Sequence, residues 1–220
     1  MSETINKYVV CPRCEQRSSM DIMCSMNTVT GSKYREKIFD ESFFRWKCGK
    51  CGFTTRLLHP LLYNDLRNKF MIYFIPNVER SRIVDEKLEK EFGELSDIKK
   101  RVAPDINTLK EKIALFEGGY NDLAVELSKH AVAEVVGRST GQNVYEGYCT
   151  EIDKNDNSIT FQFFLGGEHR SYIQTTRYDV YQRSLAIVKE YFADIDKKKG
   201  FLNINRAWAK EALKRYKNSV

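Results

Sequence analysis

Two short motifs, Cys11-Pro12-Arg13-Cys14 and Cys48-Gly49-Lys50-Cys51, decide how the first quarter of this sequence folds. The two residues between the cysteines of a C-x-x-C pair can form a turn, which points both sulfurs at one centre. Two such pairs supply four thiolates, which is the ligand set of a closed tetrahedral zinc site. The sequence therefore predicts a structural zinc ion held by Cys11, Cys14, Cys48 and Cys51.

The context of the motifs favours a metal over a redox dithiol. A dithiol oxidoreductase places its first cysteine at a helix N-terminus, where the helix dipole lowers the thiol pKa. Here Tyr8-Val9-Val10 leads into the first motif as a strand, and no helical stripe of apolar residues follows. The zinc deaminase pattern, which needs H-x-E, is missing. Four thiolates leave no position for water, so we expect a structural metal rather than a catalytic one.

The residues around the motifs predict a zinc ribbon over about residues 8–58. Thirty-three residues separate Cys14 from Cys48, which is room for a strand, an insert and a second strand. Apolar residues alternate over 20–26, as in a strand with one buried face. Further strands are expected over 43–47, 53–58 and 70–75, a short helix or loop over 31–41, and a turn over 61–66.

The middle of the chain predicts a helical hairpin over about residues 108–136. Thr108-Leu109-Lys110-Glu111 has the capping-box pattern of a helix start, and Gly118-Gly119 ends that helix. Asn121 is expected to cap the second helix and Gly137 to end it. The predicted apolar stripe of the second helix holds Ala124, Leu127, Ala131 and Val135.

The pattern changes after residue 137. Three strands over 144–152, 159–165 and 170–175 predict an antiparallel β-meander, because turn residues separate them. Two amphipathic helices follow. The expected fold class is α+β, with a zinc-binding domain over 1–137 that carries the ribbon and the helical hairpin, and a second α+β domain over 138–220 with three strands and two helices.

Composition predicts an ordinary globular protein. The chain has 220 residues, of which 42% are hydrophobic and 30% charged, which suits a packed core and excludes collagen, coiled coil and long disorder. No apolar run reaches the ~18 residues of a transmembrane helix. The N-terminus shows no apolar signal region. We therefore expect a cytoplasmic protein that does not bind membranes.

Several stretches of this sequence resemble the CpXC-domain family of bacterial proteins. They are the two C-x-x-C motifs with Phe43 to Lys47 before the second, the stretch from His59 to Tyr73, the helix-Gly-Gly-helix segment from Leu109 to Leu127, and Asn205-Arg206-Ala207-Trp208-Ala209. The second motif departs from the family by reading Cys-Gly-Lys-Cys where Cys-Pro-x-Cys is common, and Asn64 stands where a His is expected. The resemblance implies zinc binding and leaves the biochemical activity open.

Other residues that could act chemically have simpler interpretations. Cys24 and Cys149 lie in predicted strands, and we expect both to be buried free thiols. His59 could border the metal site, although a structural role is favoured. Asp65 is the best candidate for a polar functional residue, but residues of this type commonly cap turns. No Ser-His-Asp set, phosphate-binding glycine loop or paired carboxylate motif can be assigned.

Three functions remain open. A closed metal site without a catalytic set favours a non-enzymatic binding, adaptor or scaffold protein, whose partner is another protein or a second copy of the chain. The formal charge of +6 is concentrated at the two ends, because residues 1–76 hold 12 basic and 7 acidic residues and residues 138–220 hold 14 and 10. A nucleic-acid surface on the ribbon is therefore an alternative. An enzyme with an unrecognised active site is the third. The residues that would form the nucleic-acid surface are Arg13, Arg45, Lys47, Lys50 and Arg56, near Phe44, Trp46 and Phe53.

Overall fold

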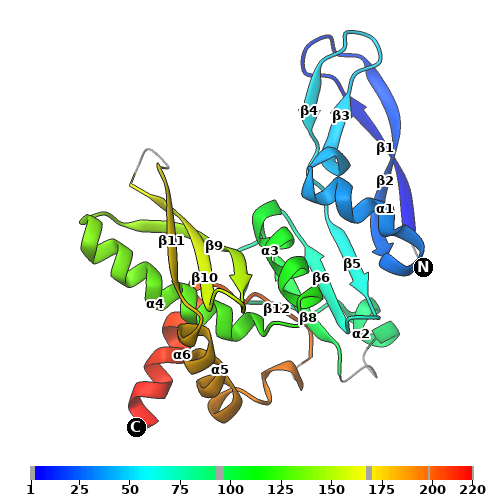
Figure 1. The fold of residues 1–220 in the computed structure, drawn as a ribbon. Coiled ribbons are helices and arrows are strands. Elements are labelled where there is room, and N and C mark those ends of the chain that lie inside the picture. Colours follow the sequence, from blue (N-terminus) through cyan, green and yellow to red (C-terminus); the bar gives the residue numbers. More distant parts are fainter. Residues whose placement is uncertain (1–2, 93–96, 167–169, 198, 220) are drawn as a thin grey trace.

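The computed structural model describes residues 3–92, 97–166, 170–197 and 199–219, and it has the predicted α+β fold. A seven-stranded sheet, a three-stranded sheet and a two-stranded sheet are combined with helices (Figure 1). None of the described helices is both long enough and apolar enough to cross a membrane.

The seven-stranded sheet has the strand order β1-β2-β5-β6-β8-β12-β7. Pairing is antiparallel for β1 with β2, β5 with β6 and β12 with β7, and parallel for β2 with β5, β6 with β8 and β8 with β12. The chain therefore returns to this sheet from very near its end. The strands are β1 (Glu3–Val10), β2 (Arg17–Asn27), β5 (Leu61–Asp65), β6 (Phe70–Phe74), β7 (Arg82–Ile83), β8 (Lys99–Ala103) and β12 (Phe201–Leu202).

Helices cover the central strands of this sheet on both sides. Helix α1 (Thr28–Phe39) and helix α3 (Ile106–Glu117) share one hydrophobic cluster with alternate residues of β5 and β6. The other residues of β5 and β6 pack in a second cluster, which helix α2 (Glu86–Phe92) borders through Leu88. Every residue of β5 is buried. The turn that the sequence predicts over 61–66 is thus wrong, because these residues form a central strand.

The helical hairpin begins and ends at residues other than those predicted. Asp105, rather than Thr108, caps α3, and its side chain accepts a hydrogen bond from the Thr108 N–H (2.8 Å). Asn121 caps α4 (Asp122–Thr140) as predicted. That helix runs through Gly137 to Gly141, which has a left-handed backbone (φ 66°). A glycine with a left-handed backbone ends a helix. Gly137 keeps the helical conformation, so the helix continues through it.

The remaining elements form the predicted meander and helices. Strands β9 (Val144–Asp153), β10 (Ser158–Leu165) and β11 (Arg170–Arg177) pair antiparallel in the order β11-β10-β9. Helix α4 packs against β9, α5 (Asp179–Tyr191) and α6 (Arg206–Ser219) (Figure 1). The predicted meander and the two α-helices after it are present, but the short strand β12 (Phe201–Leu202) was not predicted.

One hydrophobic cluster extends across the predicted division at residue 137. It joins Leu115 of α3 and Leu127 of α4 to Phe161 of β10 and Leu202 of β12. The two domains, 1–137 and 138–220, stay a prediction. What the structure adds is that α4 lies on the interior of the C-terminal half, and that β12 lies in the sheet of the N-terminal half.

Candidate metal centre

Each C-x-x-C motif forms a tight turn between two strands. The first turn joins β1 to β2, and the second joins β3 (Arg45–Lys47) to β4 (Thr54–Arg56). The Glu15 N–H donates to the Cys11 carbonyl (2.9 Å) in the first turn, and the Gly52 N–H donates to the Cys48 carbonyl (3.0 Å) in the second. Both turns lie at the same end of the arm formed by β1 to β4 (Figure 1). We call these four strands the ribbon arm.

The four motif sulfurs converge on one point between the turns. They all lie within 4.8 Å of one another. Cys11 Sγ is 3.6 Å from Cys51 Sγ, and Cys14 Sγ is 3.7 Å from Cys48 Sγ, so the close pairs cross from one motif to the other. Four sulfurs placed ~2.3 Å from a central ion in a tetrahedron would be about 3.8 Å apart. The four cysteines are therefore positioned to bind a metal ion. All are free thiols.

Burial and backbone N–H groups set the acidity of these thiols. Cys11 and Cys48 are fully buried, while Cys14 and Cys51 are half-buried. The Cys51 N–H and the Lys50 N–H lower the pKa of Cys48 to about 6. The Gln16 N–H lowers the pKa of Cys14, but burial and the three neighbouring sulfurs outweigh it and raise that pKa to about 12. A cation among the sulfurs would favour the thiolate form of all four.

A small hydrophobic cluster surrounds the centre. Cys11, Trp46 and Cys48 form its buried part, and Val9, Met20, Phe53 and Leu57 pack against it. This cluster is separate from the clusters of the main sheet. A ribbon arm with so little apolar burial of its own depends on another source of stability, which four ligated thiolates would provide.

The surface of the ribbon arm matches only half of the nucleic-acid alternative. Arg13, Lys47 and Lys50 are exposed, as phosphate contacts require. Phe44 and Trp46, however, are buried at 2% and 7% exposure. Aromatic rings stack on bases only through an open face. Of the three aromatic residues predicted to stack on bases, Phe53, which is half-buried, is the one that is not buried.

A family model described as CpXC protein matches residues 9–129. This match covers more than half of the chain and includes all four motif cysteines. The chain belongs to the CpXC family. No curated protein and no solved structure matches it. The family model ends inside α4, so most of the C-terminal half of this CpXC protein lies outside the match.

The other singled-out residues lie away from the four sulfurs. His59 packs against the rings of Phe43 and Phe44, with ring centroids 6.0 and 5.6 Å apart, and burial lowers its pKa. Asp65 caps the turn after β5, because its two carboxylate oxygens accept from the N–H (3.1 Å) and side-chain Nδ2 (2.8 Å) of Asn68. The turn-capping interpretation of Asp65 is confirmed.

Neither remaining cysteine is as buried as the sequence predicts. Cys24 lies in β2 and Cys149 in β9, and each is partly buried with a free thiol. Neither belongs to the group that could hold a metal ion. Burial raises the pKa of Cys149 to about 12, so this thiol stays protonated.

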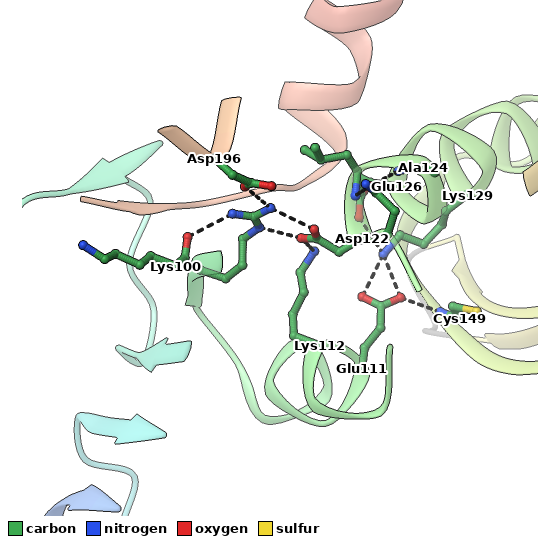
Figure 2. Close-up of polar contacts among 12 residues, drawn as sticks. Lys100, Glu111, Lys112, Asp122, Ala124, Glu126, Lys129, Cys149 and Asp196 are labelled. Carbon is green, nitrogen blue, oxygen red and sulfur yellow. Dashed lines mark hydrogen bonds and ion pairs between the residues drawn. The ribbon is translucent and has the colours of Figure 1, made fainter. Parts of the chain in front are cut away.

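Sequence reasoning missed a buried set of charged side chains between the two halves of the protein (Figure 2). Arg101 of β8 donates two hydrogen bonds to Asp122 of α4, from Nε at 2.7 Å and from Nη2 at 2.9 Å. Lys112 of α3 lies 2.9 Å from the same carboxylate. Asp196 lies 2.7 Å from Arg101. Burial would raise the pKa of Asp122, but the two cations outweigh burial and hold it well below its usual range.

A second group of charges lies one turn further along α4. Lys129 Nζ lies 3.0 and 3.1 Å from the two oxygens of Glu111 and 2.9 Å from Glu126. Glu111 also accepts from the N–H of Cys149 (2.6 Å), which fixes α3 against β9. Burial raises the pKa of Glu126. One sequence pattern could have predicted this group. The spacings of four and three residues between Asp122, Glu126 and Lys129 place all three on one side of a helix.

Proposed function

We propose that this CpXC protein is a cytoplasmic, non-enzymatic bacterial binding protein, acting as an adaptor or scaffold, whose ribbon arm is held together by one structural zinc ion. The observation that supports this is the spacing of the four sulfurs. Four thiolates complete a tetrahedral coordination sphere and leave no position for a substrate or a reactive water. Zinc suits the site because it takes tetrahedral thiolate ligands.

The proposed partner is a protein segment that adds a strand to β1. This eight-residue strand is at the edge of the seven-stranded sheet, and β2 is its only neighbour among the described residues. Tyr8 and Val10 are exposed on it at 65% and 59%. An unpaired strand edge offers a row of backbone donors and acceptors, and exposed apolar side chains add affinity. The zinc would fix this edge, because Cys11 follows directly after β1.

Metal binding is tested by replacing one ligand. Cys48→Ser removes a buried thiolate, so we expect zinc content to fall well below one ion per chain and the ribbon arm to unfold. Cys24→Ser is the matched control, because Cys24 lies in β2 outside the sulfur cluster. The measurements are metal content by mass spectrometry and thermal unfolding. Equal zinc content and equal stability in the two variants would show that the four-thiolate assignment is wrong.

Partner binding is tested on the exposed face of β1. Tyr8→Lys combined with Val10→Lys should reduce the recovery of cross-linked partners from cells at least tenfold, while zinc content stays at one ion per chain. Ile173→Lys is the control, because Ile173 is equally exposed (68%) on β11, far along the chain from β1. Equal recovery from both variants would remove β1 as the partner site without touching the zinc assignment.

The nucleic-acid alternative has its own test. Because Phe44 and Trp46 are buried, we expect the zinc-loaded protein not to retain single-stranded DNA or RNA at 0.15 M salt. Retention that falls steeply as salt rises would favour the alternative, since neutralised phosphates release counterions. The measurement is a filter-binding titration at several salt concentrations, with Lys47→Gln and Lys50→Gln together as the variant.

A further inference from the structure

A cavity of about 240 Å³ lies beside the second charge group, distant in sequence from the cysteine motifs. Its walls come from α3, α4, β9 and β10, together with residues 203–207 at the start of α6. Segments far apart in the sequence thus contribute to one space. Part of the lining is apolar, from Val144, Phe163 and Ile204. No function assigned above uses this cavity.

The charges that line the cavity are mostly negative. Four carboxyl groups face two cations, which are Lys129 and Arg206. Lys129 is shared between Glu111 and Glu126, so one cation serves two carboxyl groups there (Figure 2). Arg206 is bound by the Val144 carbonyl and by Glu134, which is not part of the lining. The four lining carboxyl groups are those of Asp105, Glu111, Glu126 and Glu146.

A buried acceptor in the lining has no partner. Asn203 is 5% exposed, and its Oδ1 atom accepts no hydrogen bond from any residue that the structure describes, while its Nδ2 donates to the Arg80 carbonyl (3.3 Å). His130 also lines the cavity, and its Nδ1 is buried without a partner. A buried polar atom without a partner costs free energy comparable to a lost hydrogen bond. A ligand with several N–H donors would remove that cost.

A metal ion does not fit this cavity. Among the described residues, the four motif cysteines are the one group of His, Cys, Asp and Glu close enough to share an ion. No three His, Asp or Glu side chains of the cavity are therefore close enough to share one metal ion. An organic cation suits the spacing better, because its charge and its carbon atoms can contact different parts of the lining.

We propose that this cavity binds a small primary alkylammonium ion, whose N–H donors satisfy Asn203 and Glu126 and whose carbon chain packs against Phe163 and Val144. The ligand is recognised by its positive charge, by its hydrogen-bond donors and by a short apolar tail. The proposal is independent of the zinc ion and of the β1 partner.

The test uses the full zinc-loaded protein and three matched probes. Butylammonium, butyrate and 1-butanol share a chain length and differ in charge, and binding is followed by amide chemical shifts in NMR titrations. We expect butylammonium to shift amides of residues 144–148 and 203–207 in a saturable way, and the other two probes to bind at least tenfold more weakly. Equal affinity for the three probes, or no binding by butylammonium, would overturn the proposal.

Variants assign the binding to the cavity. Glu126→Gln removes a lining charge, and we expect butylammonium to bind it at least tenfold more weakly. Ala207→Trp, at an exposed lining position, should block entry without disturbing the core. Glu151→Gln on β9 is the control, since Glu151 is exposed and outside the lining, and it should bind as the wild type does. Unchanged binding in both Glu126→Gln and Ala207→Trp would overturn the proposal.

The same chemistry could come from a free amine or from a lysine side chain of a protein. A fourth probe, N-acetyl-lysine methylamide, separates these sources, and either result supports an ammonium site. Tighter binding of the capped lysine would assign the ammonium group to a protein, and tighter binding of butylammonium would assign it to a free amine.

Discussion

Glu15 and Gly52 occupy the same place in the two metal turns. Each follows the second cysteine of its motif, and each has a left-handed backbone, with φ of 57° at Glu15 and 71° at Gly52. Both donate the N–H that closes the turn. Glycine adopts this conformation without steric cost, whereas a residue with a Cβ pays roughly 1 kcal/mol or more. The first turn is therefore the more strained of the two.

We predict that exchanging residue types at these positions moves stability in opposite directions. Glu15→Gly should stabilise the zinc-loaded protein by about 0.5–1 kcal/mol, because it relieves a left-handed non-glycine residue. Gly52→Ala should destabilise it by a similar amount through φ alone, since no atom lies within 4 Å of the added Cβ. Urea unfolding curves give both values. A loss of stability in Glu15→Gly would contradict the interpretation.

The residues of the metal centre could be predicted and those of the cavity could not. The spacing of a C-x-x-C pair predicts a turn that points both sulfurs at one centre. The four metal-binding positions therefore follow from the sequence alone. The lining of the cavity comes from residues as far apart as Asp105 and Ala207. Nothing local in the sequence shows that Asn203 and Glu126 line the same cavity, because tertiary packing brings their segments together.

Helix α4 is the element that connects the two halves of the protein. Its first turns are buried almost all round, from Asp122 to Lys129, so it has no single apolar stripe there. Two residues of the predicted stripe, Ala131 and Val135, are exposed. Ala124 and Leu127 of that stripe are buried as predicted, and the stripe is wrong only in the second half of the helix, where the buried residues are Val132, Ala133 and Val136. Its buried charges are tolerated because each has a partner.

We predict a pH-dependent role for Asp122. Asp122→Asn should cost about 3–5 kcal/mol near neutral pH, because it leaves Arg101 and Lys112 without a full partner in the core. The pKa of Asp122 lies below its unfolded value, so its contribution is complete above about pH 4 and is lost as pH falls further. The difference in unfolding free energy between the wild type and Asp122→Asn should thus be constant from pH 7 to 5 and become smaller below pH 4.

A paired control separates buried from exposed pairing. Asp97 also has a lysine partner, Lys69 at 2.6 Å, but its side chain is 60% exposed. Asp97→Asn should leave stability nearly unchanged at every pH, because exposed ion pairs are screened by water. Urea unfolding at each pH gives both differences. An Asp122→Asn gap that did not narrow in acid would mean that the Asp122 charge is not what stabilises the wild type.

Strand β5 shows why some elements escape sequence reasoning. Polar Asn64 and Asp65 stand in a run that otherwise resembles a strand, and Pro60 precedes it. A half-buried strand alternates polar and apolar residues, but a strand covered on both faces does not. Asn64 and Asp65 are buried at the end of β5, where Asp65 binds the following turn. The predicted meander β9 to β11 succeeded because β10 alternates buried and partly buried residues.

At the scale of the whole molecule, the sheet depends on residues that follow β6 by more than a hundred positions. Phe201 is 1% exposed, and its ring lies 5.5 Å from that of Tyr73. It belongs to the hydrophobic cluster on one face of β5 and β6. Strand β12 also lies between β8 and β7 in the sheet, so among the described strands β12 alone pairs with β7.

We predict that Phe201→Ala destabilises the N-terminal half. The loss should be about 3–5 kcal/mol, as for other buried phenylalanines, with faster amide hydrogen exchange in β6 and β8. Ile173→Ala, at an exposed apolar residue, is the control and should change stability by less than about 0.5 kcal/mol. If exchange in β6 and β8 matched the wild type in both variants, the two halves would be energetically independent, as the division at residue 137 predicts.

The position of β12 also governs the order of events during biosynthesis. A nascent chain leaves the ribosome N-terminus first. One edge of β8 therefore stays unpaired until residues 201 and 202 have left the ribosome. The metal turns, complete by residue 52, can mature while translation continues. The half of the protein that is made first therefore cannot complete its sheet until residues 201 and 202 have been made.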